Sequence, residues 1–571
     1  MAMASVLASC EDARTVTLSV EQQPNYTGAS LNRLFADPGL ESCIQSLALV
    51  NGWDLSGQVS GTLDCSSRGI RDLSGIENLS ELTTLNLANN HIDDISPLAG
   101  LRKLHYLNLS NNQVSDITVL SGLDNLTSLY VANNRLDNIT AVESLTRLQN
   151  LDLSFNALPG IDSLSSLEQL KYLNIAANNI TDIAALQNLN AMTELTLAAN
   201  AITSLSPLVA MRSLVFLDAS QNNISDITPL ESLEILRILL LYNNSIQSIT
   251  ALARMTTLQK LYLSNNLIND ISGLAQLTDL RDLLLDGNLI SDIAPLADMH
   301  RLENLLLDNN QISTVNVFSG SPNASIRNLG LSKNHITDVG ALAELVTLTR
   351  LNLGYNRITS IAALSSLVNL ETLLLETNSI EDISGLSGLT ALRLLRLDNN
   401  RITNLAPLAS LSALSALSLY SNAISDIEPL ASLVELTSLN LYDNQVTNLT
   451  PLAGLGKMQV LWLHYNDISD IVALQNLTQL QVLHLSGNHI SDPGSLQGLE
   501  ELVVLNLENN ALVDVSPLAQ LVELTELRIS ANQTMSCTSL ALILDQLGSP
   551  PVDVDGNLQT MDNVNPGVNC N

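Results

Sequence analysis

Apolar and polar positions follow one repeated arrangement along most of the chain. Between residues 82 and 523 a unit of 22 residues occurs 20 times, and the unit at 302–325 is lengthened to 24 residues. Positions 1, 4, 6, 11, 14, 17 and 20 carry leucine or a similar apolar residue in nearly every unit. Because side chains alternate between the faces of a strand, positions 4 and 6 predict a short strand whose positions 3, 5 and 7 face outward. Strands that recur at a constant interval predict a solenoid with one long parallel sheet.

Asparagine stands at position 9 of all 20 units. Its short amide favours tight turns and can bond backbone groups of its own turn and of the next unit. We therefore predict a buried ladder of asparagine side chains along the solenoid. Its first members are Asn90, Asn112, Asn134, Asn156, Asn178 and Asn200.

The second half of each unit contains helix-start signals. Proline occupies position 16 in eight units, usually after serine, threonine or alanine. Proline suits the first turn of a helix, where its missing N–H is not needed. The pattern predicts a short 3₁₀ or helical turn opposite each strand. Aspartate, at position 13 in 12 units, is interpreted as a cap for backbone amides of that turn.

These positions together form the leucine-rich repeat signature. The 22-residue period with Asp-Ile-Ser-Pro-Leu endings resembles bacterial internalin-type leucine-rich repeat proteins, and it also resembles cytosolic phosphatase regulators of the same repeat class. The resemblance covers about residues 60–545. It implies an α/β fold, a right-handed leucine-rich repeat solenoid with a parallel β-sheet on its concave face. Short 3₁₀ or helical turns are expected on the convex side, with a cap at each end.

The segments outside the repeats are expected to cover the open ends of the solenoid. Residues 31–81 are expected to form an N-terminal cap plus a degenerate repeat. Within them Leu34–Asn51 reads as an amphipathic helix, with Pro38 marking its start and Gly52 following its end. Residues 524–571 are expected to hold a partial repeat and a C-terminal cap, with a closing helix at 539–548. Residues 1–30 are interpreted as a leader or tether.

All five cysteines lie outside the 20 full repeats. Cys43 and Cys65 flank the N-terminal cap, and Cys537 and Cys570 flank the C-terminal cap. We predict a disulfide within each pair, because both pairs lie where a cap needs to be held to its neighbouring repeat. The alternative is free buried thiols in a cytosolic protein.

The remaining cysteine, Cys10, follows Leu7-Ala8-Ser9. This segment resembles the lipobox of bacterial lipoproteins, which implies lipidation of Cys10 and a membrane contact through that anchor alone. The resemblance is incomplete, because no Lys or Arg precedes Cys10 and the apolar stretch is short. Either the start of the segment is truncated or replaced, or the match is a chance one. Together with disulfides, lipidation would place the protein in the bacterial envelope or outside the cell.

Charge excludes one class of partner. The chain has 57 acidic and 24 basic residues and a net charge of −33. Nucleic-acid binding relies on Lys and Arg that displace counterions from phosphates, so no nucleic-acid partner is expected. No run of about 20 apolar residues predicts a membrane-spanning helix.

The sequence contains no motif for catalysis. We find no glycine-rich phosphate loop, no metal-spaced Cys/His cluster and no nucleophile elbow, so we expect no enzyme, no metal centre and no cofactor. A Ca²⁺-binding ladder is an alternative interpretation of the aspartate column. At position 7, Asp286 with Asp308 and Glu376 with Asp398 are spaced to share a cation, although pairing with flanking arginines is favoured.

Aromatic residues supply the candidate binding site. Nine of the 10 tyrosines fall at outward positions of the strand segment, whereas the buried positions are almost without aromatic residues. Exposed Tyr and Trp are common anchors of interfaces. The alternative is that tyrosine simply favours strands. The predicted concave patch, with its histidines, comprises Tyr106, Tyr130, Phe155, Tyr172, Phe216, Tyr242, Tyr262, Tyr355, Tyr420, Tyr442, Trp462, His464, Tyr465 and His484.

We interpret the chain as a non-catalytic scaffold that binds a protein partner on its concave face. The resemblance to internalins implies a bacterial surface or secreted protein with a role in adhesion or host contact. Two alternatives remain. The aromatic face would also suit a glycan, and a cytosolic phosphatase regulator would have the same repeats.

Overall fold

A computed structural model gives the fold of the chain. It describes residues 35–51, 60–320 and 325–533, and residues 535, 536, 538, 539 and 543. Cys10, Cys537, Cys570 and most of the predicted closing helix lie outside the described residues. Within the described part, the chain forms helix α1 (Pro38–Asn51) and then a series of strands and short 3₁₀ turns.

The N-terminal helix begins at Pro38, the residue that the sequence indicates as its start within Leu34–Asn51. Asp37 precedes it, and its Oδ1 accepts hydrogen bonds from the N–H groups of Gly39 at 2.8 Å and Leu40 at 3.1 Å. Its Oδ2 accepts from the N–H of Arg71 at 2.8 Å, which joins the cap to the first turn after β1. Burial acts to raise the pKa of Asp37, but the backbone donors together lower it below its ordinary value. The capping aspartate therefore decides where the helix starts.

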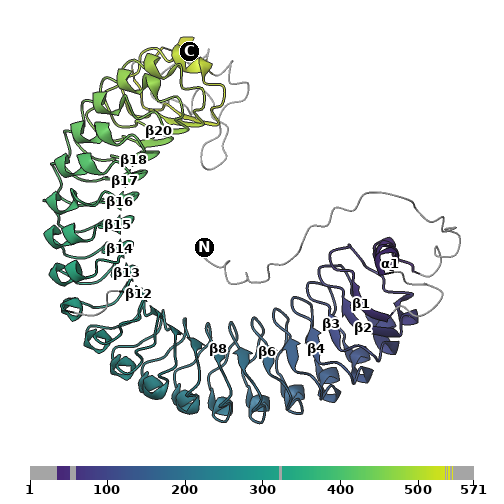
Figure 1. The fold of residues 1–571 in the computed structure, drawn as a ribbon. Coiled ribbons are helices and arrows are strands. Elements are labelled where there is room, and N and C mark those ends of the chain that lie inside the picture. The colour runs from purple at the N-terminus through teal and green to yellow at the C-terminus, as the bar shows by residue number, and fades with distance from the viewer. Residues whose placement is uncertain are drawn as a thin grey trace.

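Twenty-two parallel strands form one sheet in which each strand pairs with the next along the chain. The strands are β1 (Ser60–Asp64), β2 (Glu81–Asn86), β3 (Tyr106–Asn108), β4 (Ser128–Tyr130), β5 (Asn150–Asp152), β6 (Tyr172–Asn174), β7 (Glu194–Thr196), β8 (Phe216–Asp218), β9 (Ile238–Leu240), β10 (Lys260–Tyr262), β11 (Asp282–Leu284), β12 (Asn304–Leu306), β13 (Asn328–Gly330), β14 (Arg350–Asn352), β15 (Thr372–Leu374), β16 (Leu394–Arg396), β17 (Ala416–Ser418), β18 (Ser438–Asn440), β19 (Val460–Trp462), β20 (Val482–His484), β21 (Val504–Asn506) and β22 (Glu526–Arg528). The sheet lines the inner side of an open arc, and the 3₁₀ turns follow its outer rim (Figure 1).

The outer rim consists of short 3₁₀ turns, from η1 (Ile76–Asn78) to η21 (Ser516–Gln520). The aspartates at position 13 cap them as predicted. Asp94 Oδ1 accepts the N–H of Ser96 at 2.8 Å, and Asp226 Oδ1 accepts the N–H of Thr228 at 2.8 Å. This hydrogen bond recurs from unit to unit, so the aspartate column has a structural role in the turns.

The core is a stack of leucine layers between the sheet and the turns. Leu85, Leu87, Ile92 and their equivalents in later units are completely buried. Phe318 is the exception among these small aliphatic layers, and it fills the core of the lengthened unit at η12 (Asn316–Phe318). In the other coils the layers are aliphatic, and the aromatic residues of the strand segments are placed outward.

The predicted asparagine ladder is present. Asn112 Nδ2 donates to the carbonyl oxygens of Leu109 at 2.9 Å and of Leu87, in the previous unit, at 3.0 Å. Its Oδ1 accepts the N–H of Ile92 at 3.0 Å. The other predicted members, Asn90, Asn134, Asn156, Asn178 and Asn200, make the same inter-unit bonds. Since each amide satisfies buried groups of two units, it fixes the position of one coil on the next.

The predicted disulfide between Cys43 and Cys65 is also present, with Cα atoms 5.6 Å apart. It joins α1 to the residue that follows β1, and both cysteines are buried. The disulfide thus ties the N-terminal cap to the first coil.

Candidate binding surface

The concave face is built from positions 3, 5, 7 and 8 of the units. Positions 3 and 5 are the outward residues of each three-residue strand, and positions 7 and 8 follow where the chain leaves the sheet. The strand order places equivalent residues of consecutive units side by side, as Trp462 pairs with His484 in β19 and β20. Outward residues therefore form columns that cross the strands.

Near the C-terminal end, a column of rings in contact with one another lies beside Trp462, which pairs with His484 in the sheet. We define the C-terminal aromatic cluster as Tyr420, Tyr442, Trp462, His464, Tyr465 and His484. The rings of Tyr442 and His464 stack, with centroids 4.1 Å apart and planes inclined by 12°. Tyr420 stacks on Tyr442 at 6.0 Å. Tyr465 approaches Tyr442 at 5.8 Å, and His484 approaches His464 at 5.8 Å. The predicted column is thus a stacked surface.

The two histidines of this cluster favour the neutral form. Burial, with a smaller contribution from the neighbouring His484, lowers the pKa of His464 to about 4. Burial also lowers the pKa of His484. The buried Nδ1 of His464 has no hydrogen-bond partner within the described residues. At neutral pH the cluster is therefore an uncharged aromatic surface.

The other predicted aromatic residues do not form one continuous cluster. Tyr106 and Tyr130 contact each other, with centroids 5.4 Å apart. Burial, with Asp152 nearby, raises the pKa of Tyr172 to about 12. No ring contact links Phe216, Tyr242 and Tyr262 in the described part of the chain. The face therefore offers one dense aromatic cluster and several separate rings.

Sequence reasoning missed an apolar stripe beside those separate rings. Leu240, Leu284 and Leu306 occupy outward position 5 of β9, β11 and β12 and are half-buried, with Tyr262 between them. Most other units carry a polar or aromatic residue there. The signal was present in the sequence, because leucine at position 5 departs from the alternation that defines the unit.

Three exposed aromatic residues adopt a backbone conformation that aromatic side chains rarely adopt. Phe155, Tyr355 and Tyr465 stand at position 8 with φ of 53°, 56° and 52°. Asparagine, which tolerates positive φ, fills this position in many units. The three rings are exposed by 62%, 46% and 55%. Exposed rings held in a strained backbone gain nothing from the core, and such strain concentrates at functional sites.

Charged side chains on the concave face pair with one another in several places. Lys260 Nζ lies 3.2 Å from Asp282, and Arg281 lies 3.0 Å from Glu303. Arg396 Nε lies 3.1 Å from the completely buried Asp398, so this carboxylate is paired with arginine. No group of three or more His, Cys, Asp or Glu side chains is placed to hold a metal ion in the described residues.

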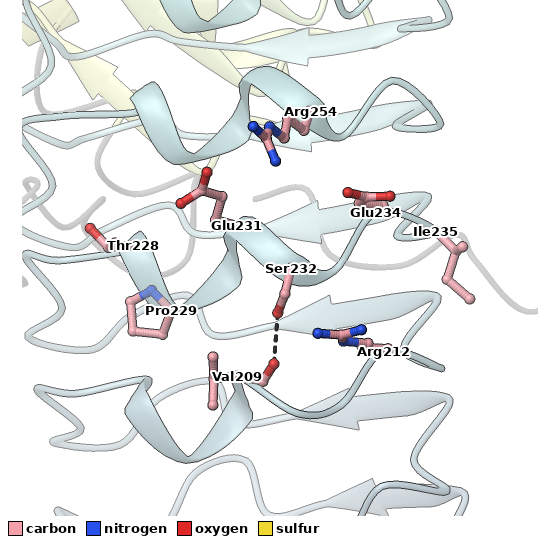
Figure 2. Close-up of a pocket in the computed structure, with 9 residues that line it drawn as sticks. All are labelled: Val209, Arg212, Thr228, Pro229, Glu231, Ser232, Glu234, Ile235 and Arg254. Carbon is pink, nitrogen blue, oxygen red and sulfur yellow. Dashed lines mark hydrogen bonds between the residues drawn. The ribbon is translucent and has the colours of Figure 1, made fainter.

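The convex side carries a shallow hollow of about 470 Å³ between η7 (Ser206–Leu208), η8 (Thr228–Ser232) and η9 (Thr250–Arg254). Figure 2 shows charged side chains of both signs spaced around it, and the Ser232 hydroxyl donating to the Val209 carbonyl at 2.6 Å. The groups do not converge on one point, and that hydrogen bond is a link between neighbouring turns. The lining residues are Val209, Arg212, Thr228, Pro229, Glu231, Ser232, Glu234, Ile235 and Arg254.

No described helix combines the length and apolar character needed to cross a membrane.

Two family models match the chain. The model described as "Leucine Rich repeats (2 copies)" matches residues 62–100, 102–144, 146–188, 236–276, 412–454 and 457–499. The model described as "Leucine rich repeat" matches residues 324–380 and 347–402. Together the matches cover more than half of the chain. A comparison with curated protein sequences finds no match.

Many solved structures are similar in fold. The plant peptide hormone receptor RGFR1 in complex with RGF2 is 22% identical with a TM-score of 0.64, and the match covers 84% of this chain and 92% of the receptor. A leucine-rich repeat protein of Leptospira interrogans is 23% identical with a TM-score of 0.51, covering 72% and 97%. An internalin of Listeria monocytogenes is 30% identical with a TM-score of 0.46, covering 68% and 97%. Such folds typically serve as protein-binding scaffolds and receptor ectodomains. The repeat pattern, the solenoid and the family matches agree that the chain belongs to the leucine-rich repeat family.

Proposed function

We propose that this protein is a non-catalytic scaffold that recognises a protein partner on its concave face. The C-terminal aromatic cluster is the observation that carries the proposal. Its rings are large, already ordered by stacking on one another, and uncharged at neutral pH. A partner that covers such a surface removes apolar area from water at little cost in side-chain entropy.

The exposed position of Tyr465 strengthens this assignment. Its ring lies against Gly487, where a Cβ atom would stand 2.7 Å from the ring. The glycine therefore makes room for a ring that is exposed and held at positive φ. Interface anchors are commonly Tyr and Trp side chains near the centre of a contact. The similar fold of the plant peptide hormone receptor RGFR1, which was solved in complex with RGF2, also supports a protein or peptide partner.

We further propose an oxidising location, at the bacterial cell surface or outside the cell. The disulfide between Cys43 and Cys65 supports this location, because such bonds persist in oxidising compartments. The internalin-type repeat pattern supports a bacterial source and a role in adhesion or contact with other cells. Lipidation of Cys10 is part of the same proposal. Intact mass of natively expressed protein, with and without reductant, tests it, and free thiols at all five cysteines would contradict it.

The binding proposal is tested by screening the full chain against an array of extracellular protein domains, beside a glycan array. The variants are Tyr442→Ala with Trp462→Ala, and the control is Val209→Ala on the convex side. We expect a protein ligand whose affinity falls by about 30-fold or more in the aromatic variant, as for interface anchors worth about 2 kcal/mol. The control should bind like the original protein, and circular dichroism should show that both variants fold. Ligands found on the glycan array alone, or protein ligands insensitive to the aromatic variant, would contradict the proposal.

A further inference from the structure

Two glycines clear a space on the concave face between the apolar stripe and the C-terminal aromatic cluster. Gly330 is the one glycine at outward position 5, and Gly354 is the one glycine at position 7, among the strands β2 to β22. They lie on the adjacent strand segments of β13 and β14, where Gly330 pairs with Asn352. Neighbouring strands carry larger side chains at these positions, and the room that the two glycines leave is taken by the carboxylates of Asp308 and Glu376. We call Asp308, Gly330, Asn352, Gly354 and Glu376 the central acidic notch.

Asp308 reaches into the notch from one side. It follows β12, and its carboxylate lies over Gly330 so closely that a side chain there would collide with Oδ2. Its Oδ1 accepts the N–H of Ser332 at 2.8 Å and the Nδ2 group of Asn352, two strands away, at 3.2 Å. The carboxylate is therefore held in an orientation that points across the sheet toward β14.

Glu376 reaches into the notch from the opposite side. It follows β15, and its carboxylate lies over Gly354, where a Cβ atom would stand 2.7 Å from the carboxyl carbon. The side chain is 7% exposed, and its buried Oε2 has no hydrogen-bond partner within the described residues. A buried carboxylate without a partner is costly, because it has lost water and gained nothing in return.

Arg396 attracts the carboxylate of Glu376 electrostatically, but no ion pair joins the two in the described residues. Arg396 Nε is bound to Asp398 at 3.1 Å, and Lys333 Nζ lies 5.7 Å from the ring centroid of Tyr355. Asn352 donates its Nδ2 group to Asp308, its Oδ1 accepts the N–H of Gly354 at 3.2 Å, and it makes no hydrogen bond to Oε2 of Glu376. The notch thus holds two carboxylates that lie over its two glycines, and Oε2 of Glu376 lacks a hydrogen-bond partner in the described residues.

We propose that the central acidic notch receives a Lys or Arg side chain of the protein partner. The inference rests on the proposed function and deepens it, since it names the chemistry of one contact. An ammonium or guanidinium group brings several N–H donors to both carboxylates at once, and charged hydrogen bonds of this kind are the strongest available to proteins. The two carboxylates alone are too few for a metal site, which takes six or more oxygen ligands for Ca²⁺.

A random peptide library displayed on phage and selected on the full chain tests the proposal. Parallel selections use Glu376→Gln, which keeps the shape and removes the charge, and Gly354→Ala, which fills the gap without requiring positive φ. Gly498→Ala is the matched control, because a Cβ atom there meets nothing within 4 Å. We expect enriched peptides to share a Lys or Arg, and to bind about tenfold or more weakly to both notch variants than to the control.

Each result has a distinct meaning. Peptides that lack basic residues, or that bind Glu376→Gln unchanged, overturn the notch proposal. If those peptides still depend on Tyr442 and Trp462, the proposed function stands without it. A selection that yields no peptide dependent on either set of residues contradicts both. Melting curves of the variants establish that any loss of binding occurs in folded protein.

Discussion

The C-terminal aromatic cluster and the central acidic notch are built on the same backbone and differ only in outward side chains. At position 7 the cluster has Tyr442 and His464, whereas the notch has Gly354 and Glu376. Beneath both, asparagines of the ladder make the same bonds, with Asn444 Nδ2 donating to Leu419 and Asn378 Nδ2 donating to Leu353, each at 3.0 Å. The inward residues give every coil the same backbone conformation and core, so the outward residues can change from apolar to charged without altering the fold.

The largest effect is expected when the asparagine ladder that runs beneath both regions is disrupted at a position between them. Asn400 Nδ2 donates to the carbonyls of Leu375 and Leu397, and its Oδ1 accepts the N–H of Ile380, all at 3.0 Å. Asn400→Ala would leave these buried groups unpaired, at a cost of about 2–4 kcal/mol. Hydrogen exchange should show faster opening of both the notch and the cluster. Local effects confined to one region would contradict a shared backbone.

A change of pH should distinguish the two regions. The folded pKa of His464 is lowered from 6.5 to about 4, so the unfolded state binds a proton first as the pH falls. Stability in the cluster is therefore complete above pH 6.5, decreases between pH 6.5 and about 4, and levels off below. Because the ring is only half-buried, we expect a loss of about 1–2 kcal/mol. Hydrogen exchange at two pH values should report this near β18 to β20. His464→Phe keeps the stack and should remove much of the dependence, and an unchanged dependence would contradict the assignment.

Removal of the unpartnered charge should separate binding from stability in the notch. Glu376→Gln replaces a buried carboxylate by a neutral amide of the same shape, and we expect a gain in stability of about 1 kcal/mol. The variant should melt at a higher temperature while it loses affinity for basic peptides. A lower melting temperature would mean that the carboxylate already has a stabilising partner.

The smallest effect is expected at the rim of the cluster. The backbone at position 465 has a φ of 52°, and asparagine tolerates this conformation better than tyrosine does. We therefore expect Tyr465→Asn to raise the free energy of unfolding by about 0.5–1 kcal/mol. The variant should bind the partner more weakly because an exposed ring is lost. Tyr465→Phe is the control, since it keeps both the ring and the strain. Equal stability of all three proteins would show that the strain is negligible.

The repeat pattern predicted more of the fold than of the site. The strands, the turn caps, the asparagine ladder and one disulfide follow from residue types at fixed positions, and each was found where the pattern placed it. The helix start at Pro38 is also confirmed, but the amphipathic pattern does not reveal that Asp37 uses its second oxygen to bind the turn after β1. The binding role of the aromatic patch remains a prediction.

The sequence by itself determined the coil, because each unit carries its own strand, turn and ladder residue, and the contacts that hold a unit lie within it or in the next one. Only the tertiary structure decided which outward residues meet. Tyr420, Tyr442 and His464 are 22 residues apart along the chain and become a stack because parallel strands bring equivalent positions side by side. Asp308 and Glu376 are separated by three units, and their carboxylates extend over the two glycines that lie between them. Side-chain direction depends on the space that neighbouring strands leave, and the pattern of a single unit does not contain that information.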